Sequence, residues 1–324
     1  MMAGLAGMPL AGPAPGAVVP QPTVGRILLG WSFDPLVAVP LLVAAALYVQ
    51  SWRRIRARGQ RWPTQRLVCF LCGLGAIALA LQSPLEAYDT VLFSVHVSQH
   101  LLLTMAAAPL LVLGAPITML LMTVPARTRK RVVRVVHSRP IQVLSHPLVA
   151  WLLFTMTLYA LYFSPLFELT LRNPLVHDLV HLHFIAVGLL FWWPVVGIDP
   201  TRWRLHHLAR VMFVFLMVPF HAFLGVAIMG SGHLLAPALG QFVRDWGPSP
   251  LADQQAGGAI MWGVGDVVSV VAVIAILAAW AQHEEKVAAR EDRRLARARA
   301  AAAEAEAGAA AAQPAAGDRR DSKL

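Results

Sequence analysis

Residues 92–122 read LFSVHVSQHLLLTMAAAPLLVLGAPITMLLM, and this stretch decides the fold. It contains no aspartate, glutamate, lysine or arginine, and it is longer than the roughly 20 apolar residues that a transmembrane helix needs. Two prolines, Pro109 and Pro116, lie in its second half. Because proline removes a backbone hydrogen bond from a helix interior, the sequence predicts a spanning helix that kinks or breaks near these residues.

Six further apolar runs lie on either side of this stretch. Together they give seven predicted spans: Pro35–Gln50, Leu67–Leu81, Leu92–Met122, Leu148–Phe163, Val176–Val196, Leu208–Gly230 and Ala256–Ala281. Inside a bilayer every backbone polar group must be paired within the protein, so apolar runs of this length predict helices. The predicted fold class is therefore all-α, a polytopic membrane bundle with seven transmembrane helices. In the last run Gly258, Gly263 and Gly265 are predicted to allow close helix packing.

The composition supports a membrane protein. Hydrophobic residues make up 57% of the chain and charged residues only 14%, whereas a soluble domain carries roughly 25% charged residues. The mean hydropathy is +0.61. The net charge of +10 lies in short blocks between apolar runs, which indicates membrane orientation rather than nucleic-acid binding.

Basic residues occupy every second connection between the spans. All lysines and arginines except Arg26, Arg172 and Arg244 follow the first, third, fifth or seventh span. Cytoplasmic loops of membrane proteins carry the excess of lysine and arginine. The alternation therefore predicts an amino terminus outside the cytoplasm and a carboxyl terminus inside it.

The same pattern divides the chain into three parts. Residues 1–33 are predicted to be a flexible leader rich in Gly, Pro and Ala, and residues 34–282 the seven-span domain. Residues 283–324 are predicted to be a basic cytoplasmic tail, helical through Ala312 and disordered from Gln313 onward.

Histidine pairs mark the ends of two spans that are predicted to begin outside the cytoplasm. His96 and His100 lie four residues apart in the third span, and His177 and His181 do so in the fifth. Residues four apart share one face of a helix. Ionisable groups inside a membrane are costly and usually meet a partner, a metal or a water-filled cavity. Asp178 is predicted to orient one of the imidazoles, as carboxylates do for metal-binding histidines.

Two more spans carry candidate metal ligands at a similar depth in the membrane. At a rise of about 1.5 Å per residue, His221 lies roughly 13 Å from the outer end of the sixth span, and Asp266 of the seventh span lies at a similar level. Met217 precedes His221 by four residues. Thioethers suit Cu(I), and imidazole suits copper in either oxidation state. The predicted metal ligands are therefore His96, His100, His177, His181, His221, Asp266 and Met217.

Packing is the competing interpretation of several of these residues. A single intramembrane histidine such as His221 is often a packing residue, and methionine commonly fills gaps in apolar cores. Cys69 and Cys72 have the spacing of thiol ligands, but they lie in an apolar run away from the histidines, where packing is the better interpretation.

Several blocks together resemble a known family. HVSQH at 96–100 is followed by APLLVLGAP at 108–116, and later by NPLVHDLVHLH at 173–183 and FWWP at 191–194. In this order they resemble the CtaG family of membrane proteins, the assembly factors of caa(3)-type cytochrome c oxidase. The resemblance covers roughly residues 67 to 230.

The resemblance implies a seven-span fold, a role in maturing a haem–copper oxidase, and the handling of copper. Its motifs include His96, His100, His177 and His181. We therefore expect an assembly factor in the bacterial plasma membrane that holds copper transiently in an outward-opening pocket and passes it to an oxidase subunit. We do not expect an enzyme, since the sequence has no nucleophile elbow, phosphate loop or metalloprotease motif.

Three alternatives remain at this point. An electron-transfer protein would use His100 and His181 as axial haem ligands on opposite faces of the porphyrin. A copper transporter would need polar groups along the whole path, where Cys69 and Cys72 are the best candidates in the inner half. In a structural scaffold the histidines would only bond one another.

Overall fold

The computed structural model describes residues 18–242 and 244–311, and the side chains up to residue 305. All its regular elements are helical: α1 (Val24–Leu29), α2 (Pro35–Ala57), α3 (Thr64–Gln82), α4 (Pro84–Tyr88), α5 (Phe93–Leu101), the π-helix η1 (Leu102–Ala107), α6 (Ala108–Leu113), α7 (Pro116–Thr123), α8 (Ala126–Val136), α9 (Arg139–Leu144), α10 (Pro147–Tyr162), α11 (Leu166–Arg172), α12 (Pro174–Val196), α13 (His207–Phe215), α14 (Met217–Met229), the 3-10 helix η2 (Pro237–Gly240) and α15 (Pro250–Ala311).

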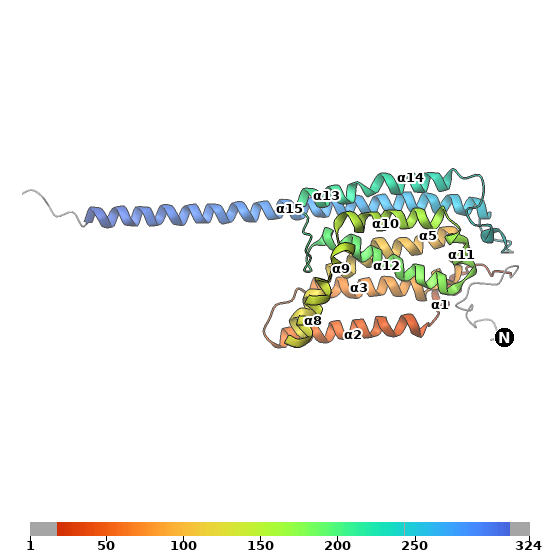
Figure 1. Cartoon of the computed structure of the whole chain (residues 1–324), viewed down its shortest axis with the longest axis horizontal. Helices are drawn as coiled ribbons and strands as arrows, with labels where there is room; N and C mark the ends of the chain where they lie inside the picture. Colours follow the sequence, from red (N-terminus) through yellow and green to blue (C-terminus); the bar gives the residue numbers. More distant parts are fainter. Residues whose placement is uncertain (1–17, 243, 312–324) are drawn as a thin grey trace, which may run out of the picture. The chain divides into compact units, whose positions relative to one another are not determined.

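The chain forms two compact units, with a boundary between Val273 and Ile274 inside α15. In the first unit the long helices lie along a common axis (Figure 1). There α2 packs on α3, α3 on α6, α6 on α12, α12 on α10, and α10 on α14. In the second unit α15 is helical through Ala311. The predicted disordered segment from Gln313 lies outside the described residues.

The number of spans is six or seven. Six helices are long and apolar enough to cross a membrane, including the composite helix Phe93–Thr123. The fourth predicted span, Leu148–Phe163, corresponds instead to one part of a bent pair, because α10 and α11 meet at an angle of 71°. The fold class of a polytopic helical membrane bundle is confirmed, and the pair counts as a seventh span only if α10 and α11 cross together.

The third span is interrupted where the prolines predict. The π-helix η1 precedes Pro109, and Ala115 adopts a left-handed conformation (φ 51°) immediately before Pro116. Asp199 accepts hydrogen bonds from the backbone N–H groups of Ile117 and Thr118 at the start of α7. A buried carboxylate thereby pairs the free N–H groups that a new helix start exposes.

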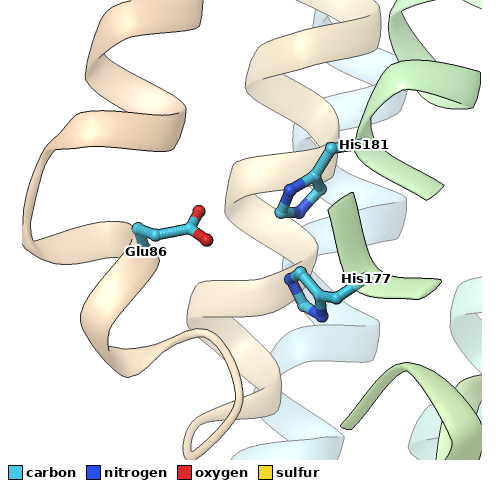
Figure 2. Close-up of side chains that lie close together, drawn as sticks. All are labelled: Glu86, His177 and His181. Atoms are coloured by element: carbon cyan, nitrogen blue, oxygen red, sulfur yellow. The ribbon is translucent and has the colours of Figure 1, made fainter. Parts of the chain in front are cut away.

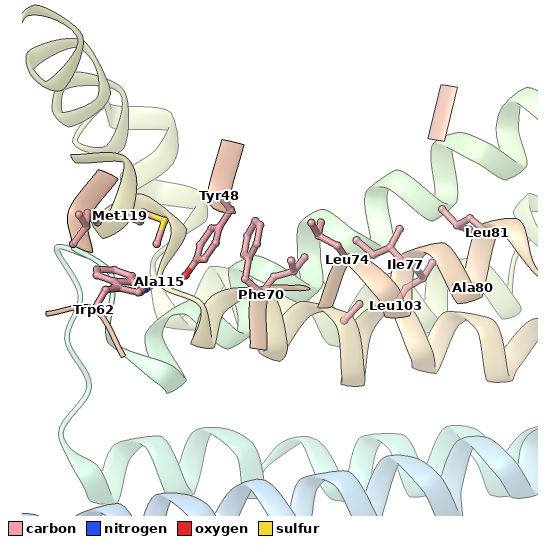
Figure 3. Close-up of a cluster of buried hydrophobic side chains, with 13 residues drawn as sticks. Tyr48, Trp62, Phe70, Leu74, Ile77, Ala80, Leu81, Leu103, Ala115 and Met119 are labelled. Carbon is pink, nitrogen blue, oxygen red and sulfur yellow. The ribbon is translucent and has the colours of Figure 1, made fainter. Parts of the chain in front are cut away.

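A buried cluster joins α2 and α3 to the composite third span (Figure 3). Tyr48 stacks on Phe70 with ring centroids 4.0 Å apart, and the Tyr48 hydroxyl donates to the carbonyl of Gly114. Leu74, Ile77 and Leu103 continue the cluster. This packing fixes α3, whose far end leads into the acidic turn α4.

Residues 18–33 are the described part of the predicted leader, and they include the short helix α1. Val19 is 1% exposed, and its carbonyl accepts from the indole of Trp246. The Tyr88 hydroxyl donates to the carbonyl of Pro20. Aromatic side chains therefore hold this segment against the bundle, although its glycine- and proline-rich composition is typical of a flexible chain.

Close packing between α14 and α15 gives a stability prediction. A Cβ on Gly258 would lie 2.8 Å from the carbonyl oxygen of Gly225, whereas a Cβ on Gly263 would meet nothing within 4 Å. We expect Gly258→Ala to destabilise the bundle by about 1–3 kcal/mol, as overpacking does. Thermal unfolding in detergent measures this, and Gly263→Ala is the matched control. Equal melting temperatures for the two variants would contradict the packing.

Candidate metal centre

Three helices bring polar side chains together at one end of the first unit. Ser83 starts α4 by accepting from the N–H of Leu85, and this single turn carries Glu86 and Asp89. Asn173 starts α12 in the same way by accepting from the N–H groups of the next turn, and α12 carries His177 and His181. The side chains of α5 lie between these two helices.

Four imidazoles lie next to one another in a ring, each in contact with two others. His96 and His100 are 4.1 Å apart between ring centroids, His100 and His181 5.5 Å, His181 and His177 4.3 Å, and His177 and His96 5.7 Å. All four side chains are buried. The structure therefore brings together the two histidine pairs that the sequence singled out.

Asp89 fixes the orientation of His177. Its Oδ2 lies 2.7 Å from His177 Nε2, and both side chains are buried. Since a carboxylate accepts, Nε2 carries a proton, and in the neutral imidazole Nδ1 keeps its lone pair. A carboxylate behind a histidine is the usual outer support of a metal-binding imidazole.

Gln99 orients two further side chains at once. Its amide nitrogen donates to the carbonyl of Ala80 at 3.0 Å and to Glu86 Oε2 at 2.6 Å. Because both of these atoms only accept, the amide oxygen of Gln99 must face His181 Nε2, 3.1 Å away. His181 therefore donates through Nε2, and its Nδ1 keeps a lone pair.

Several ring nitrogens of this cluster are buried without a hydrogen bond. Both nitrogens of His96, Nε2 of His100 and Nδ1 of His177 find no partner among the described residues. An unpaired buried polar group costs about 1–3 kcal/mol. Such a cost, repeated within one cluster, indicates that the site is built for a ligand that accepts nitrogen lone pairs.

Two sets of three side chains have donor atoms within 4.8 Å of one another. The first is Glu86, His177 and His181, and the second is Asp89, His96 and His177. Figure 2 shows the carboxylate of Glu86 directed toward the two imidazoles of α12. Donor atoms 2.0–2.1 Å from one ion lie at most about 4.2 Å apart, so a shift of less than one ångström would complete either set.

The first set is the better prepared of the two. Each of its ligands has one atom engaged by an outer partner, Asp89 or Gln99, and another atom available. In the second set, Asp89 Oδ1 and His177 Nδ1 are also unpaired, but no outer partner among the described residues holds either ring nitrogen of His96. We therefore treat Glu86, His177 and His181 as the candidate ligands, with His96 and His100 as adjacent donors.

The remaining predicted ligands do not join these sets. His221 stacks against Phe154 at 6.1 Å between ring centroids, and a Cβ at position 265 would lie 2.6 Å from its Nδ1. Met217 is fully buried, and Asp266 belongs to neither group of histidines and carboxylates among the described residues. Asp178 is exposed, so the carboxylate that orients His177 is Asp89 and not its chain neighbour.

Glu86 and Asp89 were missed by reasoning from the sequence. They lie in the connection between the second and third spans, in the segment SPLEAYD at 83–89, where acidic residues look like ordinary solvated loop residues. The available signal was the Ser-Pro start of a short helix, which places residues three apart on one face. The bend that carries this turn over the bundle depends on tertiary packing.

The π-helix below His100 belongs to the same region. Thr104 donates to the carbonyl of His100, and the indole of Trp192 donates to the carbonyl of Thr104. The Tyr162 hydroxyl lies 3.2 Å from His100 Nδ1. Single turns of π-helix occur frequently at functional sites, because they rotate the residues before them relative to those after.

The fold and the site thus define a polytopic helical membrane protein with a buried histidine–carboxylate centre. The family model of the cytochrome c oxidase caa3 assembly factor matches residues 46–283. The chain belongs to this family.

Three mycobacterial proteins match most of this chain. Proteins named as uncharacterized in Mycobacterium bovis and Mycobacterium tuberculosis are each 36% identical over 287 residues, which is 86% of this chain and 43% of theirs. A third in Mycobacterium leprae is also 36% identical, over 44% of its length. The chain therefore spans less than half the length of these relatives. No solved structure matches it.

The Gln99 network gives a prediction at this site. Gln99→Leu removes the acceptor that fixes His181 and the donor that holds Glu86, so we expect metal affinity to fall about tenfold, as loss of outer partners does. Titration with a competing chelator measures the affinity. Ser98→Ala is the control, since Ser98 only bonds the carbonyl of Ser94 in its own helix. An equal affinity for both variants would refute the orienting role.

Proposed function

We propose that this chain is a non-catalytic assembly factor that holds one copper ion as cargo for a haem–copper oxidase in the same membrane. Glu86, His177 and His181 would bind the ion. The observation that carries the proposal is the arrangement around these three side chains, in which Asp89 and Gln99 occupy one atom of each ligand and leave another available. Membership of an oxidase assembly family supports copper as the cargo.

The donor set agrees with copper. Imidazole suits copper in either oxidation state and also zinc, and a carboxylate favours a divalent ion. Thioether ligands would favour Cu(I), whereas the donors of the two candidate groups are imidazole nitrogens and carboxylate oxygens. Copper therefore competes with zinc for this site, and the test below must compare the two metals.

The orientation of the site is also part of the proposal. Arg66 lies at the start of α3 beside the basic connection, and Glu86 follows the other end of the helix. If the basic connections face the cytoplasm, as they commonly do, the metal centre faces the opposite side of the bacterial plasma membrane. Copper would then be bound on the extracytoplasmic side.

The haem alternative has less support. His100 and His181 make an edge-on contact at 5.5 Å between ring centroids, and His100 also packs on Phe184 at 4.3 Å. A porphyrin bound by both histidines would have to lie between their rings. The described contacts favour a single ion over a planar macrocycle.

Metal analysis tests the proposal. The purified chain is loaded with equal copper and zinc in mild detergent, desalted, and its metal content measured by mass spectrometry. We expect about one copper per chain and little zinc. A strain that lacks the chain should lose oxidase activity and recover part of it with added copper. A chain that retains no copper, or retains zinc instead, would refute the copper role.

A further inference from the structure

A pocket of about 530 Å³ lies between α2, α3 and α12. Its walls are apolar and include Leu41, Ile77, Leu81 and Ile185. Pockets of this size with a few polar groups among apolar walls are typical binding sites. The polar groups here are concentrated where the pocket meets the metal centre.

The pocket reaches the candidate ligands directly. Glu86 and His181 both line it, and both belong to the first set of donor atoms. His96 and His100, in contrast, do not line the pocket. A molecule in the pocket would therefore contact the ion through the side of the site that Glu86 and His181 form.

The mouth of the pocket lies on a surface that faces lipid. Leu36 of α2 is 84% exposed and Leu182 of α12 is 62% exposed, and both line the pocket. Leu182 lies in the middle part of α12 and Leu36 at the start of α2, and exposed leucines on apolar spanning helices contact the lipid of the bilayer. The pocket therefore opens sideways into the membrane.

Charge restricts what can enter. Asp34, Glu86 and Asp178 all line the pocket, so its polar end carries carboxylates and one histidine. Anionic lipid headgroups and fatty acids would be repelled, because like charges brought together in a low dielectric are unfavourable. A neutral side chain that can bind copper, such as that of methionine or histidine, meets no such penalty.

A second, smaller opening differs in kind. A cavity of about 30 Å³ is lined by Glu86, Asp89, Thr90 and His177 among others. This volume holds about one water molecule. The small cavity is large enough for an ion but too small for a protein segment. The two cavities therefore suit ligands of different size.

Resting on the proposed function, we infer that the lateral pocket is the port through which a membrane-embedded segment of the receiving oxidase subunit takes copper. The segment lies against α2 and α12 and inserts a methionine or histidine side chain beside Glu86 and His181. One bond from copper to the incoming side chain forms as one bond to Glu86 or His181 breaks. Copper keeps its oxidation state, and no other reactant is needed.

Filling the pocket tests this inference. Ile185→Trp and Leu41→Trp should leave copper per purified chain unchanged and lower copper-dependent oxidase activity in membranes at least fivefold. Val226→Trp, on the exposed face of α14, should change neither quantity. If the pocket variants keep both the wild-type copper content per chain and the wild-type oxidase activity, the transfer role of the pocket is refuted and the proposed copper binding is not. A wild-type chain without copper would instead overturn the proposed function.

A photo-crosslinking residue gives an independent readout should tryptophan disturb the metal site. Placed at Leu41 in the otherwise unchanged chain, it should link to the copper-receiving oxidase subunit, and placed at Val226 it should not. Crosslinks from Leu41 to lipid or quinone alone, or equal links from both positions, would overturn the inference.

Discussion

A chain with alanine in place of His177 is expected to bind copper at least about 100-fold more weakly than the wild type. His177 belongs to both sets of donor atoms, so neither set survives its loss. Removing an outer partner of a ligand already costs about 10–100-fold in affinity, and losing the ligand itself costs more. Copper retained after desalting and chelator competition measure the effect.

His183→Ala is the matched control for this variant. His183 lies on the same helix, is exposed, and its Nε2 is 2.9 Å from the Thr157 hydroxyl outside the cluster. Because His177→Ala also leaves the buried Asp89 without its partner, the variant risks misfolding. His181→Ala keeps the Asp89–His177 pair and should still weaken copper binding strongly. Equal copper in His181→Ala, His183→Ala and the wild type would remove the basis of the site.

The sequence was sufficient for the fold because a bilayer permits few solutions. An uncharged run such as residues 92–122 must be helical, and Pro109 and Pro116 indicated where it would deviate. Local sequence could not show the 71° bend between α10 and α11, because α10 alone is long enough to look like a short span. It also could not show that Val19 is buried, since that depends on Trp246 far along the chain.

The candidate site was predictable only where one helix sets the geometry. The spacing of His96 with His100, and of His177 with His181, fixed each pair on one face, and the structure brings the two pairs together. Depth alone suggested that His221 would join them. Depth does not determine which way a helix face points, and His221 instead packs against Phe154.

The imidazole of His221 packs closely against α15. A Cβ at position 265 would lie 2.6 Å from His221 Nδ1, so Gly265 leaves the space that the imidazole occupies against α15. Gly258 and Gly265 make the close contacts predicted for the last span, whereas a Cβ at position 263 would meet nothing within 4 Å. The two nitrogens of His221 are buried and have no hydrogen-bond partner among the described residues, so its role as a ligand stays a prediction.

Glu86→Gln is expected to lower copper affinity about 30–100-fold, which would distinguish the two donor sets. In the first set Glu86 is the only charged ligand, and a neutral amide would leave the cation without a compensating charge in a low dielectric. If the ion instead binds Asp89, His96 and His177, the same substitution should have little effect. Chelator competition on the purified variant measures the difference.

Asp89→Asn completes the comparison. An asparagine oxygen still accepts the proton on His177 Nε2, so this variant should keep the first set and lose no more than about tenfold in affinity, the lower end of the range for outer partners. The opposite order, with Asp89→Asn the more damaging change, would move the ion to the second set. The lateral pocket would then be separated from the metal, because Asp89, His96 and His177 do not line it. The relative effect of these two substitutions therefore decides both where copper binds and whether it is within reach of the bilayer.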